Sequence, residues 1–260
     1  MTYLVDSHCH LDRLDLDAFG GSLANLISEA QKLDVKTILC IGIDLENAKA
    51  VTDIAQQFPN VYASIGLHPS ENEGEEATVE RLIELAQAPK VVAIGETGLD
   101  YHYEHTPKEL QHERFNMHIT AAQTLKKPLI IHTRKAQEDT LSILREHQVD
   151  SGVFHCFTEE YEMAKAGLDL GLYISFSGII TFKNAEDLRA TVKKIPLERI
   201  LVETDAPYLT PVPHRGKANF PGYTRFVAEC IASLKGISYE EVAEVTTNNF
   251  MNLFNLNRSA

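Results

Sequence analysis

Hydrophobic residues in this chain gather into short continuous runs, each of which ends in polar or small residues. The runs contain mainly Val, Ile and Leu without strict alternation, a pattern typical of parallel strands buried on both faces. We predict eight strands, at residues 3–10, 37–43, 61–69, 91–100, 128–134, 152–158, 172–179 and 200–207.

The segments between these runs carry apolar residues at the helical period, and several open with Asp, Asn, Thr or Pro. Helices are predicted at residues 18–33, 45–57, 78–87, 107–126, 135–147, 158–170 and 184–194, with a helical tail at 223–235 and 238–256. Eight strand–helix units in 260 residues match the usual size of a (β/α)₈ TIM-type barrel, about 250 residues. A doubly wound open sheet would need a glycine-rich phosphate loop after the first strand, where this chain has His8 and His10.

The composition fits one domain over residues 1–260. Hydrophobic residues make up 44% of the chain, enough for a core, and no Pro-, Gly- or Ser-rich linker divides it. No targeting segment or membrane-length apolar run is found, so we expect a cytoplasmic protein without membrane contact. Reduced packing cysteines are expected because none of the four has C-x-x-C spacing; they are Cys9, Cys40, Cys156 and Cys230, the first three inside predicted strands.

The net charge is −13, from 24 basic and 37 acidic residues. This charge argues against broad non-specific binding to duplex nucleic acid, which depends on neutralising phosphates. A local site is still possible, because several cations follow predicted strand ends: Arg134, Lys135, Lys183, and Arg215 and Lys217 in the loop at residues 212–222.

Six residues of metal-ligand type fall near the ends of the apolar runs: His8, His10, Glu96, His132, His155 and Asp205. In an extended strand His8 and His10 point to the same side, so they can hold one ion while Cys9 points away. Imidazoles and carboxylates suit a pair of divalent ions, and a barrel places its active site at the carboxyl ends of its strands. The pattern therefore predicts a metal-dependent hydrolase.

Six motifs in register resemble the TatD family of metal-dependent deoxyribonucleases, in the amidohydrolase-like barrel group. They are DSHCHLD at residues 6–12, GLHP at 66–69, GETGLDY at 95–101, IIHTR at 130–134, FHCF at 154–157 and ETDAP at 203–207. The resemblance covers essentially the whole chain. It implies a divalent-metal-dependent 3′-to-5′ exonuclease acting on DNA, although the family also includes uncharacterised hydrolases.

The resemblance also implies a role for each ligand. His8 and His10 match the first metal pair, and Glu96 the bridging carboxylate. Ligands of the second metal would be His132 and His155, with Asp205 a ligand at the end of the eighth strand. Many barrels of the wider group bridge their metals with a carbamylated lysine. Here Lys90 lies at the opposite end of the fourth strand from Glu96, which favours a carboxylate bridge.

Two ions about 3.5 to 4 Å apart could generate hydroxide near neutral pH and neutralise the charge on a phosphodiester under attack. Asp205 is placed to accept the proton of the attacking water, and Glu203, in the same strand phase, could orient the water or a ligand. A buried ion pair is the structural alternative for Glu203. His68 could bond a phosphate oxygen or protonate the leaving group, or it could be an ordinary rim histidine.

The expected substrate is DNA with single-stranded 3′ ends. A loop with Tyr101, His102, Tyr103 and His105 could stack on bases, although loop packing is an alternative for these side chains. His112, His118 and His147 fall in predicted helices and are expected at the surface or between helices.

Two other functions stay open: hydrolysis of an amide, lactone or small phosphoester on the same scaffold, and metal binding without turnover. The ligand set suits zinc or manganese, whereas the family resemblance implies magnesium.

Overall fold

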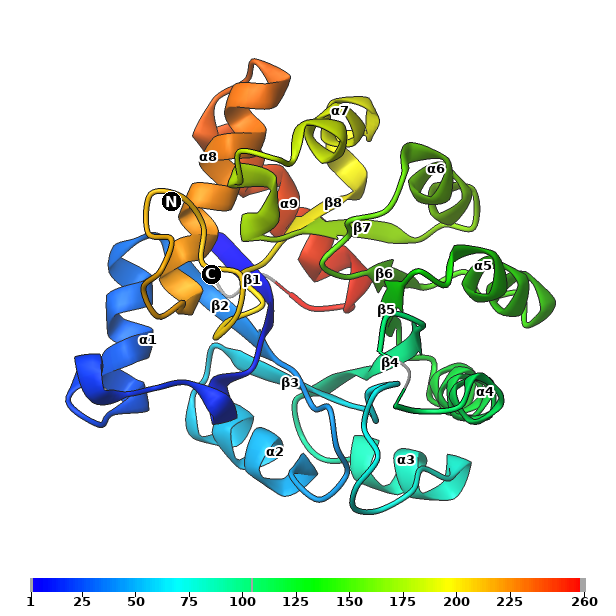
Figure 1. The fold of residues 1–260 in the computed structure, drawn as a ribbon. Helices are drawn as coiled ribbons and strands as arrows, with labels where there is room; N and C mark the ends of the chain where they lie inside the picture. Colours follow the sequence, from blue (N-terminus) through cyan, green and yellow to red (C-terminus); the bar gives the residue numbers. More distant parts are fainter. Residues whose placement is uncertain (1, 104, 258–260) are drawn as a thin grey trace. The chain divides into compact units, whose positions relative to one another are not determined.

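The computed structural model describes residues 2–103 and 105–257. Within this part of the chain, eight strands alternate with helices, the element order of a (β/α)₈ barrel (Figure 1). The strands are β1 (Leu4–Cys9), β2 (Val35–Cys40), β3 (Val61–Ile65), β4 (Val91–Asp100), β5 (Leu129–Arg134), β6 (Gly152–Phe154), β7 (Tyr173–Phe176) and β8 (Ile200–Val202). The helices are α1 (Leu23–Lys32), α2 (Ala48–Gln57), α3 (Val79–Ala86), α4 (Lys108–Leu125), α5 (Gln137–Glu146), α6 (Tyr161–Asp169), α7 (Glu186–Lys194), α8 (Thr224–Lys235) and α9 (Tyr239–Leu253).

The chain divides into two compact units. One contains the described residues up to Leu39 and from Ser175 onward, and the other runs from Cys40 to Ile174. The prediction of one domain over residues 1–260 includes residues 1, 104 and 258–260, which lie outside the described part of the chain. No helix among the described residues is both long and apolar enough to cross a membrane.

Strand β4 has the predicted bounds, whereas several others end earlier than predicted. Strand β6 ends at Phe154 and β8 at Val202, and the φ angles of 43° at Cys156 and 56° at Asp205 prevent either strand from extending over its predicted range. A left-handed backbone cannot continue a strand, so the segment after each of these two strands turns away from the sheet. Cys156, predicted to lie inside a strand, therefore follows the end of β6. The predicted strand at 172–179 likewise ends at Phe176 and continues as a 3₁₀ turn, Gly178–Thr181.

In the Cys40–Ile174 unit, strands β3, β4, β5 and β6 are neighbours in that order and pair in parallel. Figure 1 shows α2 to α5 on the outer side of these strands. The register places Gly98 beside His132 and Ile131 beside Phe154. Parallel strands bring their carboxyl ends to one edge, so this register brings the residues around Glu96, His132 and His155 together.

In the other unit, the end of β1 runs beside the segment that follows β8. Cys9 and Ala206 form a parallel bridge, and the backbone N–H of Asp205 donates to the carbonyl of His8 at 2.9 Å. Helices α8 and α9 pack on β1 and β8. Cys9 is fully buried on the side opposite His8 and His10, as the strand phase predicts for a packing cysteine.

Three lysines bind the carbonyl groups left unpaired at helix carboxyl ends. Lys90 Nζ donates to Ala55 at the end of α2, Lys127 Nζ donates to the carbonyl of Ala86 at the end of α3, and Lys235 Nζ donates to Ile195 after α7, each at 2.6 Å. Lys90 thus has a structural partner at the start of β4, away from Glu96.

Candidate metal centre

The unit that contains β1 and β8 brings together three of the predicted ligands. Asp205 Oδ1 lies 3.4 Å from His10 Nε2 and 3.6 Å from His8 Nε2. His8 is fully buried and His10 nearly so, whereas the Asp205 side chain retains 15% exposure. The left-handed φ of Asp205 aims its carboxylate back toward the end of β1. Strain of this kind at a non-glycine residue is common at functional sites.

The Cys40–Ile174 unit brings together the other predicted residues around one oxygen atom. Glu96 Oε1 lies 2.8 Å from His155 Nε2, 3.2 Å from His132 Nδ1 and 3.4 Å from His68 Nε2. Glu96 itself is 3% exposed. A buried carboxylate with three imidazoles around one oxygen is a concentrated set of metal-ligand types.

Two glycines let β4 carry Glu96 into this position. Gly95 and Gly98 have φ angles of 138° and 132°, which side chains rarely adopt. A Cβ atom on Gly95 would lie 2.5 Å from the carbonyl oxygen of Ile130, and one on Gly98 would lie 2.0 Å from that of His132. The GETG sequence is therefore required because β4 presses its backbone against β5 on both sides of Glu96.

A hydrogen bond to Asp100 indicates which ring nitrogen of a neutral His132 carries the proton and which carries the lone pair. Nε2 of His132 lies 3.0 Å from Asp100 Oδ2, a carboxylate that can only accept when ionised. The ring proton is therefore assigned to Nε2, which leaves Nδ1 as a lone pair directed at Glu96. This is the carboxylate–histidine arrangement that supports metal ligands.

His68 has the opposite assignment. Its Nδ1 accepts from the backbone N–H of Ser70 at 3.1 Å, so a neutral ring carries its proton on Nε2, the nitrogen that faces Glu96. Ligand atoms of His68, Glu96 and His132 all lie within 4.8 Å of one another. A protonated nitrogen cannot bind a metal, however, so His68 fits a hydrogen-bond donor better than a ligand.

The electrostatics agree with the assignment of a neutral His68. Burial raises the pKa of Glu96, but His155 and His68 outweigh it and hold that pKa well below its usual value. Burial lowers the pKa of His68, and the Glu96 carboxylate offsets this only in part. Burial also lowers the pKa of His132, but the hydrogen bonds to Asp100 and Glu96 reverse the shift and raise it, because a protonated ring donates to both carboxylates. A metal ion held by Nδ1 would replace the proton that this nitrogen shares with Glu96. The cluster thus combines an ionised Glu96 with a neutral His68.

The spacing of the donor atoms fits divalent ions. Bonds of about 2.0 to 2.2 Å to a tetrahedral ion put its ligand atoms about 3.3 to 3.6 Å apart. In one cluster the separations to Asp205 are 3.4 and 3.6 Å, and in the other His132 Nδ1 lies 3.2 Å from Glu96 and 3.4 Å from His155 Nε2. Glu96 Oε1 and His155 Nε2, 2.8 Å apart, would have to move apart to reach this range. Both clusters could hold an ion with small adjustments.

Comparison with known proteins connects this geometry to a family. The family model described as TatD related DNase matches residues 5–255. The chain belongs to the TatD DNase family.

Two bacterial relatives of this TatD-family chain carry the description of uncharacterized metal-dependent hydrolases. YcfH of Escherichia coli strain K12 is 50% identical over 259 residues, which cover 99% of this chain and 97% of YcfH. YabD of Bacillus subtilis strain 168 is 40% identical over 257 residues, 98% of this chain and 100% of YabD. This chain is accordingly a metal-dependent hydrolase.

A crystal structure of YJJV, a TatD homologue from Escherichia coli K12, shares the fold. Its TM-score to this chain is 0.91 at 29% identity, with 98% of both chains covered. Together with the alternation of eight strands and helices, this similarity confirms the predicted (β/α)₈ TIM-type barrel.

Beneath the β1–β8 cluster lies a pair of buried carboxyl groups, Asp6 and Glu203, both 0% exposed. Asp6 Oδ1 accepts from the backbone N–H of Thr204 at 2.9 Å, and Asp6 Oδ2 accepts from its hydroxyl at 2.5 Å. Burial raises the pKa of Asp6 to about 8, and the charge of Glu203 adds to this effect. The predicted strand phase shared by Glu203 and Asp205 is wrong, because β8 ends at Val202 and Asp205 has a left-handed φ. Glu203 is nevertheless fully buried, and Asp6 is a neighbour that the sequence analysis did not single out.

Three further residues missed by the sequence analysis lie on one face of α4. Gln111 binds the backbone N–H and carbonyl of Asp100, and Arg114 binds the carbonyl of Glu71. His118 Nε2 accepts from the N–H of Leu67, the residue before His68, at 2.9 Å. His118 is 0% exposed, so of its two expected places the surface is wrong, and its Nε2 binds the segment after β3. The helical spacing of these polar residues was visible in the sequence, but it does not tell whether they face the strands or the solvent.

The predicted loop residues have mixed roles. Tyr101 donates to Asp139 at 2.6 Å and also contacts His112, so it packs the loop rather than presenting a free ring. The ring of Tyr103, by contrast, is 46% exposed, with His105 parallel to it at 6.0 Å. In the loop at 212–222, Arg215 lies over the ring of Phe182 and Lys217 is exposed.

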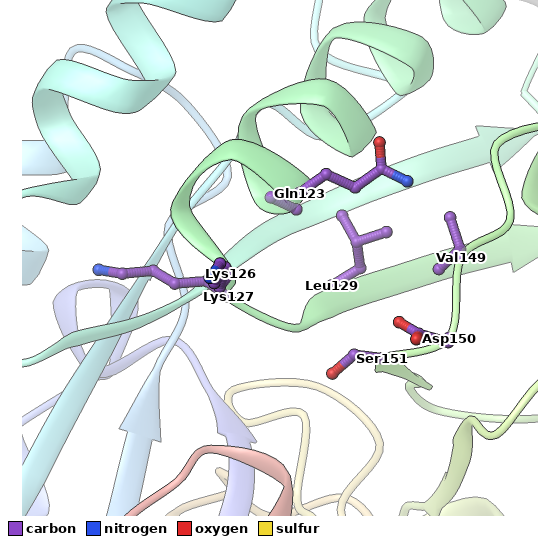
Figure 2. Close-up of a pocket in the computed structure, with 8 residues that line it drawn as sticks. Gln123, Lys126, Lys127, Leu129, Val149, Asp150 and Ser151 are labelled. Atoms are coloured by element: carbon purple, nitrogen blue, oxygen red, sulfur yellow. The ribbon is translucent and has the colours of Figure 1, made fainter.

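A cavity of about 270 Å³ lies elsewhere in the Cys40–Ile174 unit. Figure 2 shows Gln123, Lys126, Lys127, Leu129, Val149, Asp150 and Ser151 around it. Leu129 begins β5, so the cavity is at the amino end of the strand whose other end carries His132. It contains none of the predicted ligands.

Proposed function

We propose that this chain is a 3′-to-5′ exodeoxyribonuclease that hydrolyses phosphodiester bonds at single-stranded 3′ ends of DNA with two divalent ions. The description of the matching family as DNases supports the substrate. The observation that carries the proposal is that each unit contains its own cluster with the spacing of metal ligands. Strands of this fold deliver catalytic residues to one rim, the carboxyl ends.

In this proposal His8, His10 and Asp205 hold one ion, His132 and His155 hold the other, and Glu96 is shared. Bound divalent ions would lower the pKa of a water molecule and neutralise charge on the phosphate. Their identity is proposed as Mg²⁺, Mn²⁺ or Zn²⁺, because imidazoles favour the softer ions and carboxylates suit all three.

Side chains of the protein accept and donate the protons of the reaction. Asp205, partly exposed, accepts a proton from the attacking water, whose oxygen forms the new bond to phosphorus. His68 presents an Nε2–H and donates it to the leaving oxygen or holds a phosphate oxygen, consistent with its Ser70 hydrogen bond. Glu203, fully buried two residues before Asp205, orients the groups above it.

The test is incubation of purified protein with single-stranded DNA labelled at its 5′ end, in Mg²⁺, Mn²⁺ or Zn²⁺. Stepwise shortening from the 3′ end is expected, and chelation should abolish it. The same label on a blocked 3′ end should stay intact, which distinguishes this direction from endonuclease cleavage. No shortening with any ion, together with turnover of an amide, lactone or small phosphoester, would replace the proposal with the alternative hydrolase.

A further inference from the structure

Large apolar side chains with an exposure near one half are concentrated on two loops. Among the described residues these are Tyr103 at 46%, Tyr208 at 53% and Val212 at 46%. Tyr103 follows β4, the strand of Glu96, and the other two follow β8, just after Asp205. Single exposed apolar residues are ordinary on a protein surface, but their restriction to loops that leave candidate ligand positions is not explained by packing.

Tyr208 has a fixed backbone under its exposed ring. Its N–H donates to the carbonyl of Asp205 at 2.9 Å, and its carbonyl accepts from the side chain of Asn219. Asn219 is 3% exposed and also donates to the carbonyl of Thr204 at 3.1 Å. The backbone that carries the ring is therefore held in place by buried hydrogen bonds, which reduces the entropy lost when a ligand stacks on the ring.

The ring of Tyr208 lies beside a candidate ligand. Its centroid is 6.2 Å from that of His10, with 70° between the planes, so the two rings meet in a T-shaped contact and do not stack on each other. The hydroxyl makes no hydrogen bond within the described part of the chain. A flat apolar ring on a fixed backbone, next to a candidate metal ligand, matches the aromatic platforms that bind unpaired bases.

The rest of the same loop supplies complementary charge. Lys217 is exposed and lines a cavity of about 630 Å³ together with Phe19, Phe220 and Tyr223. Asn219, which fixes Tyr208, lies two residues from Lys217. In a chain with a net charge of −13, a cation beside aromatic rings suits a phosphate that follows a stacked base.

We propose that Tyr208 is the residue on which the 3′-terminal base of the nucleic-acid substrate stacks. This inference rests on the proposed nuclease function and adds a base contact to it. Stacking does not depend on base identity, because every base presents a π face. The contribution of Tyr208 to substrate affinity should therefore depend on whether the terminal nucleotide carries a base and not on which base it is.

The first measurement is binding without turnover. A single-stranded oligonucleotide with phosphorothioate terminal linkages, which slow hydrolysis, carries 2-aminopurine at its 3′ end and is titrated in Mg²⁺. The unsubstituted protein should quench the fluorescence by stacking. Tyr208→Leu should lose the quenching and bind about 5- to 150-fold more weakly, the usual worth of one stacked base. Tyr208→Phe should retain both, because the hydroxyl has no hydrogen bond to lose.

The matched control is Tyr62→Leu, since Tyr62 is a part-exposed tyrosine of β3 whose ring lies under Lys90 Nζ at 5.4 Å. It should quench like the unsubstituted protein. Equal loss in Tyr62→Leu and Tyr208→Leu, or full quenching by Tyr208→Leu, would overturn the stacking role.

The second measurement separates this inference from the nuclease function. KM is compared for an ordinary oligonucleotide and for one whose 3′-terminal nucleotide is abasic. Tyr208→Leu should raise KM for the first and leave KM for the second unchanged, with Tyr208→Phe restoring the difference. Suppose that the unsubstituted protein shortens DNA and that Tyr208→Leu shows the same KM as the unsubstituted protein on both substrates. The stacking role then fails and the nuclease function stands. If the unsubstituted protein shortens neither substrate, both fail.

Discussion

Asp100 Oδ2 lies 3.0 Å from His132 Nε2, while Asp100 Oδ1 accepts from the backbone N–H groups of His102 and Tyr103 at 2.8 and 3.2 Å. One buried carboxylate therefore fixes both a candidate metal ligand and the loop that follows β4. Burial raises the pKa of Asp100, but the hydrogen bond from His132 and the two backbone bonds lower it to about 2. Asp100 stays ionised at every pH at which the protein would work.

The first prediction is that Asp100→Asn weakens metal binding. An amide can present an N–H to His132 Nε2, which favours the ring form with its proton on Nδ1, the nitrogen needed by the ion. Loss of such an outer partner typically costs about 10- to 100-fold in metal affinity or activity. Calorimetric metal titration of the purified variant measures this. Asp139→Asn, which alters an exposed carboxylate on α5, serves as the control, and affinity equal to the unsubstituted protein for Asp100→Asn would remove the assigned role.

How far the sequence predicted the structure depended on the range of the interactions. The β4 bounds and most helices followed from local periodicity, and the six ligand types followed from their positions at strand ends. Asp100 was missed because it lies in an apolar run and its partner His132 is distant in the chain. The early end of β8 was missed because Asp205, with its φ of 56°, is bonded to the end of β1, a residue far away in the sequence that no local pattern reveals.

The polar residues on one face of α4 also depend on interactions that are distant in the sequence. Gln111, Arg114 and His118 have helical spacing, but polar residues with this spacing usually face solvent. Here they are 1%, 5% and 0% exposed, because the loops after β3 and β4 need backbone partners. Only tertiary structure distinguishes a solvated stripe from one that positions loops.

The second prediction concerns the number of ions. Two clusters with ligand spacing should bind two divalent ions per chain, and chelation should abolish hydrolysis. Elemental analysis after dialysis against excess Mn²⁺ or Zn²⁺ gives the ratio. A ratio of one at saturating metal, with full activity, would contradict the shared role proposed for Glu96.

The third prediction separates two roles of Asp205. Asparagine keeps one oxygen donor but cannot take a proton at neutral pH, so Asp205→Asn should lower kcat by about 10² to 10⁴ if the residue is the base. Substrate binding should change much less. His132→Asn should instead weaken metal affinity first and regain part of its activity at high metal concentration.

Measuring kcat for both variants across a metal titration tells the cases apart. Recovery of near-normal kcat by Asp205→Asn at high metal would show that only a ligand was missing. Its assignment as the base would then have to be withdrawn.

The last prediction concerns stability at low pH. Burial lowers the pKa of His118 from 6.5 to about 4, although the hydrogen bond from its Nδ1 to the carbonyl of Arg114 opposes this shift. Its Nε2 accepts from the N–H of Leu67 and so carries no proton in the folded protein. The folded protein thus disfavours the proton that the unfolded chain binds. Stability from this residue is fully present above pH 6.5 and is lost as the pH falls toward 4, by at most about 3 kcal/mol at 1.36 kcal/mol per pKa unit.

His118→Gln tests this, because glutamine can accept from Leu67 but does not titrate. The free energy of unfolding, from urea titrations in chelator at several pH values, should fall less steeply between pH 6.5 and 4 in the variant than in the unsubstituted protein. His147→Gln, at the carboxyl end of α5 and partly exposed, should keep the steeper fall. Parallel curves for His118→Gln and the unsubstituted protein would mean that His118 is as easily protonated in the folded chain as in the unfolded one, and that its bond to Leu67 does not exclude the proton.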